Sequence, residues 1–138
     1  MKFDHVFEYV EIESEYLKNI LNDTLERISR YIDLEKLNLG PIKEMPTFSG
    51  EVAEVTENGW IVINSKQLQE LEHHVAMAII AHEIAHSYLE HYLDMMSDDG
   101  GLQNEKEADD QARKWGFDVD YFREVLGPPH STEKLNNP

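Results

Sequence analysis

Cysteine is absent from this chain of 138 residues. Without a thiol, the protein forms no disulfide, binds no metal through a thiolate and uses no cysteine nucleophile. Any metal site must therefore be built from other side chains.

Basic residues are scarce. The chain has 12 lysines and arginines against 28 aspartates and glutamates, which gives a formal net charge of −16. Binding to nucleic acid requires a basic face, and adhesion to an anionic membrane requires basic clusters. We therefore expect no nucleic-acid partner and no membrane partner. A basic substrate or protein partner remains open, because an acidic field attracts cations.

Long hydrophobic runs are also missing. The longest run, Val75 to Ala81, has seven residues, whereas a membrane-spanning helix needs about 20. The N-terminal stretch MKFDHVFEYVEIESEY carries acidic residues early, unlike a signal or transit peptide. We expect a cytoplasmic protein with one domain over residues 1–138, because two separate cores would each be marginal at this length.

The first half of the chain predicts a helix followed by a hairpin. Apolar residues after Ser14 recur at steps of three and four, which predicts an amphipathic helix that begins at Ser14 and ends near Asp33. Further along, strand-forming residues flank an Asn-Gly pair. This pair predicts a tight turn between antiparallel strands over residues 50–56 and 60–64.

The second half is predicted to be helical. Its expected helices cover residues 67–94, 103–115 and 118–126, and residues 127–138 form an irregular tail. The first of these helices is predicted to be interrupted near Glu70. Its middle is apolar on all sides, so it should lie in the core.

A candidate metal motif, His82-Glu83-Ile84-Ala85-His86, follows the apolar run directly. Histidines four residues apart share one helix face, so both imidazoles can reach one tetrahedral zinc ion. Glu83 lies beside them and can act as a general base toward a metal-bound water. The alternative is a solvated helix face with incidental histidines. The apolar run disfavours it, because buried histidine and glutamate side chains need partners.

A catalytic zinc site usually has a third protein ligand. His91 lies five residues after His86, about 140° around a continuing helix, and is therefore predicted to point elsewhere. Glu105 and Asp109 are four residues apart on the next helix and share a face. Glu105 can ligate the metal, while Asp109 can accept the outer ring N–H of a ligand histidine. The alternative is an ordinary acidic first turn, which is favoured at helix N-termini.

The segment from Ala76 to Gly116 resembles the gluzincin metallopeptidases. It carries HEIAH on one helix and EKEAD, an E-x-x-x-D element, on the next. The combination looks most like the minimal soluble gluzincins, which are similar to the catalytic domains of the membrane-bound CAAX-prenyl and heat-shock proteases. The resemblance implies an α+β, zincin-like domain with a backing helix, a small antiparallel sheet or hairpin, a zinc helix and a glutamate helix.

The resemblance also implies roles for individual residues. It implies one zinc ion per chain, held by His82, His86 and Glu105. It also implies Glu83 as general base and Asp109 as the residue that contacts the outer ring nitrogen of a ligand histidine. The implied reaction is hydrolysis of a peptide or protein substrate by water activated at the metal.

The resemblance also implies a cationic or hydrogen-bonding residue that stabilises the oxyanion. His130, Arg123, Tyr121 and Tyr92 are candidates. His130 lies in the tail and could instead help to plug the cleft, as in minimal gluzincins that resemble zymogens. The alternative for His130 is a disordered surface residue.

Several functions therefore remain open. The first is a zinc-dependent endopeptidase, either active or latent. The second is a catalytically silent zinc-binding module that regulates or binds a protein, which the small size favours. Glu83 favours the enzyme, because a structural zinc site needs no base. A regulatory protease of the ImmA/IrrE type shares HEIAH and E-x-E-A, but no helix-turn-helix segment is recognisable here. A metal-free helical bundle is disfavoured by Glu105 and Asp109. The oligomeric state is not predicted.

Overall fold

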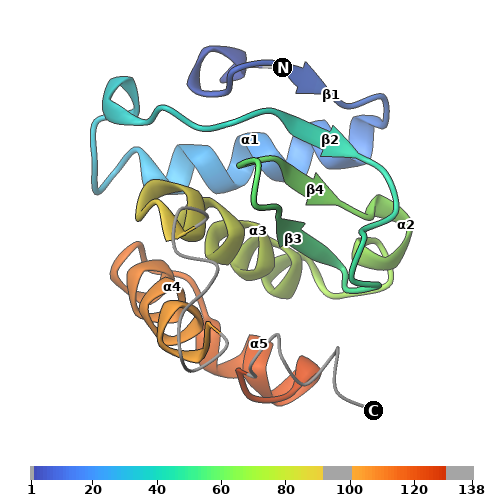
Figure 1. Ribbon diagram of the computed structural model, residues 1–138, viewed down its shortest axis with the longest axis vertical. Coiled ribbons are helices and arrows are strands. Elements are labelled where there is room, and N and C mark those ends of the chain that lie inside the picture. Colours follow the sequence, from blue (N-terminus) through green and yellow to red (C-terminus); the bar gives the residue numbers. More distant parts are fainter. Residues whose placement is uncertain (1, 92–100, 130–138) are drawn as a thin grey trace.

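The computed structural model describes residues 2–91 and 101–129 (Figure 1). Its helices are α1 (Glu15–Ile28), α2 (Ser65–Leu68), α3 (His73–Tyr88), α4 (Leu102–Lys114) and α5 (Val119–Leu126). Its strands are β1 (Val10–Glu11), β2 (Ile42–Glu44), β3 (Ala53–Val55) and β4 (Ile61–Ile63). The described residues thus form the predicted mixed α+β fold, which is compatible with a zincin-like domain.

Helix α3 lies at the centre of the fold. It packs against α1, β3 and β4 on one side and against α4 and α5 on the other (Figure 1). Every residue from Val75 to Ser87 is buried. The apolar run accounts for the first part of this burial, because a helix that is apolar all round belongs in a core. The polar residues that follow the run are therefore carried into the interior.

Helix α1 begins after the predicted cap, Ser14, and packs against α3. The Ser14 hydroxyl accepts a hydrogen bond from the backbone N–H of Leu17. The helix ends at Ile28, earlier than predicted. Asp33 instead caps the short 3-10 turn Leu34–Lys36 by accepting the N–H of Glu35. A short polar side chain of this kind competes with helix by bonding the local backbone.

The sheet has the order β1-β2-β4-β3. The β3–β4 pair is antiparallel and turns at Gly59 with a φ of 81°, so the predicted hairpin is confirmed. The sheet as a whole is not antiparallel, however, because β1 pairs with β2 and β2 with β4 in parallel. Strands of two and three residues are too short to show an alternating pattern in the sequence.

The helical second half follows the prediction closely. The predicted helix over residues 67–94 is divided into α2 and α3 by a turn at Glu70. Helix α3 ends at Tyr88, earlier than expected. The helices predicted over residues 103–115 and 118–126 are α4 and α5, and each boundary agrees within one residue. Their position matters for the site, because α4 and α5 both pack against α3.

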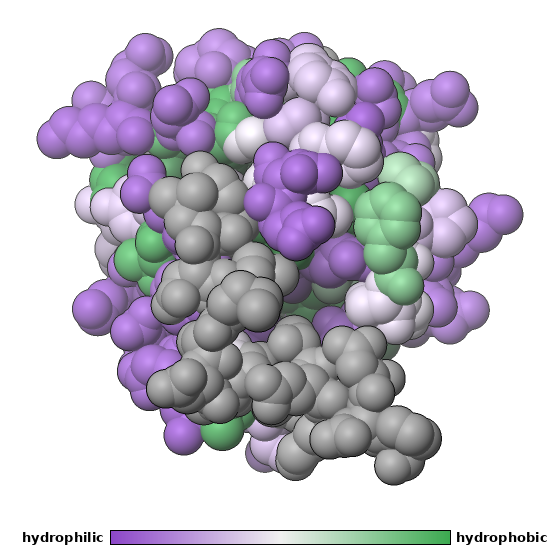
Figure 2. Space-filling model, in the orientation of Figure 1, coloured by the Kyte–Doolittle hydropathy of each residue, from purple (hydrophilic) through white to green (hydrophobic). Residues whose placement is uncertain are grey.

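The visible surface is largely hydrophilic on the face shown in Figure 2. Among the residues that the structure describes, no helix combines the length and apolarity that crossing a bilayer would require. The most exposed large apolar side chain in this part of the chain is Phe48, on the loop between β2 and β3.

Candidate metal centre

Two packed helices bring three potential ligands together. One ligand atom from each of His82, His86 and Glu105 lies within 4.8 Å of the others, so the three side chains could hold a metal ion. The Nε2 atoms of the two histidines are 3.0 Å apart. The Glu105 carboxylate lies 2.8 Å from Nε2 of His82 and 3.2 Å from Nε2 of His86. No other group of this kind occurs within residues 2–91 and 101–129.

A carboxylate contacts the opposite side of the His82 ring. Oδ1 of Asp109 lies 2.8 Å from Nδ1 of His82. Arg123 on α5 donates two hydrogen bonds of 2.8 Å to the same carboxylate, from Nε to Oδ2 and from Nη2 to Oδ1. A carboxylate only accepts, so a proton shared in this contact lies on Nδ1 of His82, although the two groups are not aligned as an ordinary hydrogen bond. When His82 is neutral and carries this proton, its Nε2 has the lone pair and can serve as a ligand atom.

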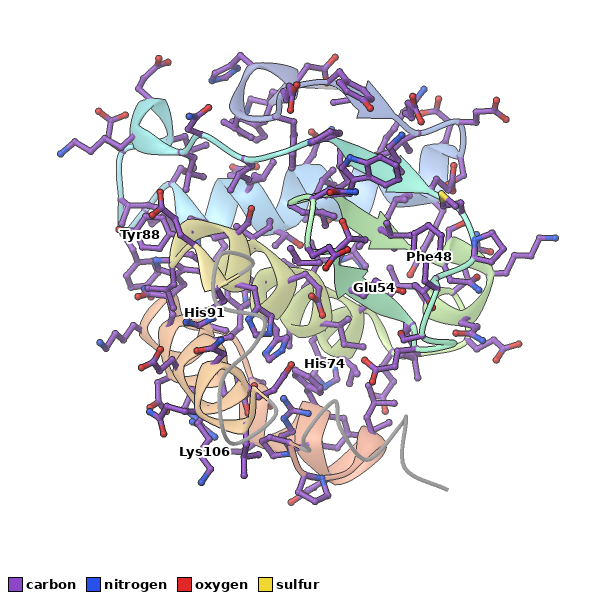
Figure 3. All side chains as sticks on the ribbon, in the orientation of Figure 1. Phe48, Glu54, His74, Tyr88, His91 and Lys106 are labelled. Atoms are coloured by element: carbon purple, nitrogen blue, oxygen red, sulfur yellow. The ribbon has the colours of Figure 1, made fainter. Side chains whose placement is uncertain are left out.

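His91 contacts the corresponding atom of His86. The two Nδ1 atoms are 2.9 Å apart, and Nε2 of His91 lies 2.9 Å from Oε1 of Glu107. Figure 3 shows His91 between α3 and α4. His91 is thus not among the three grouped ligand atoms, as predicted, although it contacts a ligand histidine. The prediction assumed a continuing helix, but α3 ends at Tyr88 and Glu90 adopts a φ of 59°, which turns the chain back.

The three ligand atoms fit a cation. With both rings neutral and protonated at Nδ1, two imidazole lone pairs and a carboxylate would face one another, and such acceptors repel unless a proton or a metal ion lies between them. In a tetrahedral zinc site with bonds of about 2.0–2.1 Å, two ligand nitrogens lie roughly 3.3 Å apart. The observed separation of the two Nε2 atoms, 3.0 Å, is close to this. Two imidazoles and one carboxylate are also a donor set that zinc accepts at catalytic sites.

The pKa shifts in the metal-free site also bear on whether it can hold a cation. Burial lowers the pKa of His82, but contacts with Asp109 and Glu105 outweigh it and raise the pKa to about 10. Burial also lowers the pKa of His86. For Glu105, burial raises the pKa, but hydrogen bonds from His82 and His86 bring it below its ordinary value. Glu105 and Asp109 thus favour positive charge at His82, which a bound metal ion would supply.

Glu83 is buried next to the cluster, with 7% of its surface exposed. Burial raises the pKa of its carboxyl group to about 8, and the carboxylates of Glu105, Glu51 and Glu54 add to the effect. Glu54 lies on β3, which packs against α3 (Figure 3). A carboxyl group that titrates near neutral pH is suited to taking up and releasing a proton.

The oxyanion candidates are placed differently. Arg123 reaches the cluster, 3.8 Å from Glu105, but its guanidinium is engaged by Asp109. Tyr121 donates its hydroxyl hydrogen to Glu72 at the start of α3. His130 and Tyr92 lie outside the described residues. The pairing of Arg123 with Asp109 was missed in the sequence, because an arginine one helix turn into α5 carries no signal of its partner.

The comparisons bear on this same part of the chain. Residues 48–109 match the model of peptidase family M48. The matched stretch is a little under half of the chain, and it contains the hairpin, α3 and the part of α4 that carries Glu105 and Asp109. Comparison with curated proteins and with solved structures gives no match. The match supports a relationship of this segment to the zinc metallopeptidases, for which the substrates are peptides or proteins.

Proposed function

We propose that the protein is a zinc-dependent endopeptidase of the minimal gluzincin type, located in the cytoplasm. The observation that carries the proposal is the convergence of His82, His86 and Glu105 on one point, with Glu83 buried beside them. A silent zinc-binding module would require the three ligands but not a further buried carboxyl group with a raised pKa.

The proposed ligands of a single zinc ion per chain are His82, His86 and Glu105. Asp109 holds the proton on Nδ1 of His82 and is itself held by Arg123. This arrangement keeps the Nε2 lone pair of His82 directed at the metal position.

Glu83 is the proposed general base and acid. When bound, zinc lowers the pKa of a coordinated water and polarises a substrate carbonyl. The Glu83 carboxylate takes a proton as the water oxygen attacks the carbonyl carbon, and it then delivers that proton to the nitrogen of the leaving amine. Burial raises the pKa of this carboxyl group to about 8 in the absence of metal, which supports a role in holding a proton near neutral pH.

The sheet offers a place for the substrate. β3 is the edge strand in the order β1-β2-β4-β3, so within the described residues no strand pairs with its outer side. An extended peptide can add to such an edge through main-chain hydrogen bonds. Because β3 packs against α3, a peptide bound there would run past Glu83 and the metal position. A substrate bound in this way through a segment in the middle of its chain would be cleaved internally, as by an endopeptidase.

The test is cleavage of an unstructured, cysteine-free protein by the zinc-loaded chain. Full-length protein is compared with a version truncated after Gly127, each with its Glu83→Gln counterpart. Cleavage that requires Glu83 supports the endopeptidase. Cleavage only after truncation shows that the tail with His130 blocks the site, and hence that the full-length chain is latent. Zinc binding with no cleavage by any form would favour the silent module.

A further inference from the structure

A buried histidine that the proposed mechanism does not use lies behind the second candidate ligand. His91 is only 8% exposed and contacts His86 of α3 and Glu107 of α4. Both contacts are 2.9 Å long, so His91 bridges the two helices that build the candidate metal centre.

The Glu107 carboxylate determines which nitrogen atoms of His91 and His86 carry a proton. Glu107 only accepts, so Nε2 of His91 carries a proton and donates it. The other nitrogen of a neutral His91, Nδ1, is then an acceptor. It faces Nδ1 of His86, which must therefore carry the proton in that contact. Nε2 of a neutral His86 is left with a lone pair, and this atom faces His82 and Glu105.

We infer that His91 is a positioning residue for the metal centre: held by Glu107, it accepts the Nδ1–H of His86 and so directs the Nε2 lone pair of His86 at the metal. The inference rests on the zinc site of the proposed function. Each proposed histidine ligand then has a polar partner at Nδ1 that is itself bound by a second residue. Asp109, bound by Arg123, contacts His82. His91, bound to Glu107, contacts His86.

The backbone that brings His91 to this place is unusual. Glu90 has a φ of 59°, in the left-handed region that side-chain-bearing residues seldom adopt, and it follows Leu89, the C-cap of α3. Glycine is the residue that ends helices in this way at least cost. A strained residue persists where the surroundings hold it, and here the turn carries His91 back between α3 and α4.

A direct role of His91 as a metal ligand does not fit the geometry. His91 lies against Nδ1 of His86, whereas the cluster forms at Nε2, on the other side of the same ring. A ligand of the same ion would have to approach the Nε2 side. The contact of His91 with Glu107 also occupies its second nitrogen.

The experiment measures zinc affinity of the full-length chain by competition with a chromophoric chelator. His91→Leu removes the acceptor and should weaken zinc binding by about 10–100-fold, the usual cost of losing such a partner. His91→Gln keeps an acceptor oxygen and should restore most of the affinity. The matched control is His73→Leu, which removes an exposed histidine from the start of α3 and should bind zinc as the wild type does.

A second pair of variants covers the case in which His91→Leu does not fold. The Glu107 side chain is 48% exposed, so its replacement leaves the core intact. Glu107→Leu should weaken zinc binding several-fold, while Glu107→Gln, which still accepts from His91, should stay near the wild type.

The outcomes separate this inference from the proposed function. Wild-type zinc affinity in His91→Leu and in Glu107→Leu would overturn the role of His91 and leave the zinc site standing. Equal losses in His91→Leu and His91→Gln would also overturn it, because the acceptor would then be irrelevant. Wild-type protein that binds no zinc would overturn both proposals, whereas zinc binding without proteolysis would overturn the peptidase alone.

Discussion

The Asp109 carboxylate lies 2.8 Å from Nδ1 of His82, on the side of the ring opposite to Glu105. His82 is thus held between two carboxylates from one face of α4, four residues apart. The orientation of this ring depends on the packing of α4 against α3, and any metal at the site would link the two helices.

Replacing Asp109 should weaken zinc binding without removing a ligand. Asp109→Ala leaves the Nδ1–H of His82 and the guanidinium of Arg123 without their acceptor, and we expect zinc affinity to fall by about 10–100-fold. Chelator competition measures this. Asp109→Asn keeps one acceptor oxygen and should lose less; identical affinities in the wild type and Asp109→Ala would contradict the supporting role.

Substitutions of Glu105 and Glu83 should have different effects on metal binding and on activity. Glu105→Ala removes a proposed ligand, so the purified protein should no longer hold zinc stoichiometrically. Glu83→Gln should retain one zinc per chain and lose proteolysis by a factor of at least about 100, because the base is gone. Metal analysis and a cleavage assay on both variants check this. A stoichiometric metal content in Glu105→Ala would refute the ligand assignment.

Glu44 should make stability depend on acidic pH. Burial raises the pKa of its carboxyl group, but hydrogen bonds from the hydroxyls of Ser14 and Ser65 and from the N–H groups of Ser14 and Glu13 bring it to about 2. A pKa lowered by folding stabilises the protein above the unfolded value, near 4.5, and this contribution is lost as the pH falls from there to about 2.

Glu44→Gln tests this in the metal-free protein by urea unfolding. The variant should be about 1–2 kcal/mol less stable than the wild type near neutral pH, and the difference should shrink at about pH 3. Glu8→Gln removes an exposed carboxylate and serves as the control, with a change of at most about 0.5 kcal/mol. A difference that is constant over this pH range would argue against the role of Glu44.

Gly40 should not tolerate a side chain. A Cβ atom there would lie 2.1 Å from the backbone oxygen of Gly59, in the hairpin turn. Neither backbone can move away freely, so Gly40→Ala should cost about 2–3 kcal/mol in unfolding free energy. Gly50→Ala is the comparison: its Cβ meets nothing, although its φ of 83° is unfavourable, and it should cost about 1 kcal/mol. Equal thermal stability of Gly40→Ala and the wild type would show that the turn moves easily.

The sequence predicts the elements whose signals are local. Ser14 caps α1, Asn58 and Gly59 turn the hairpin, and the four-residue spacings place His82 with His86 and Glu105 with Asp109. These features depend on residues that are close together in the chain, where helix and turn geometry fixes their relation.

The features that sequence reasoning missed depend on distant partners or on where a helix ends. β1 and β2 are short and pair in parallel across long separations. The contact of His91 with His86 was missed because no glycine marks the end of α3; Glu90 takes the left-handed conformation instead. The pairing of Arg123 with Asp109 requires the position of α5, which follows only from the packed fold.

Anomalous diffraction at the zinc absorption edge shows directly whether zinc binds between α3 and α4. Crystals of the full-length protein with equimolar zinc should show one strong peak, about 2.0–2.1 Å from Nε2 of His82, from Nε2 of His86 and from a Glu105 oxygen. A peak only at exposed histidines such as His73, or no peak between the two helices, would contradict the account.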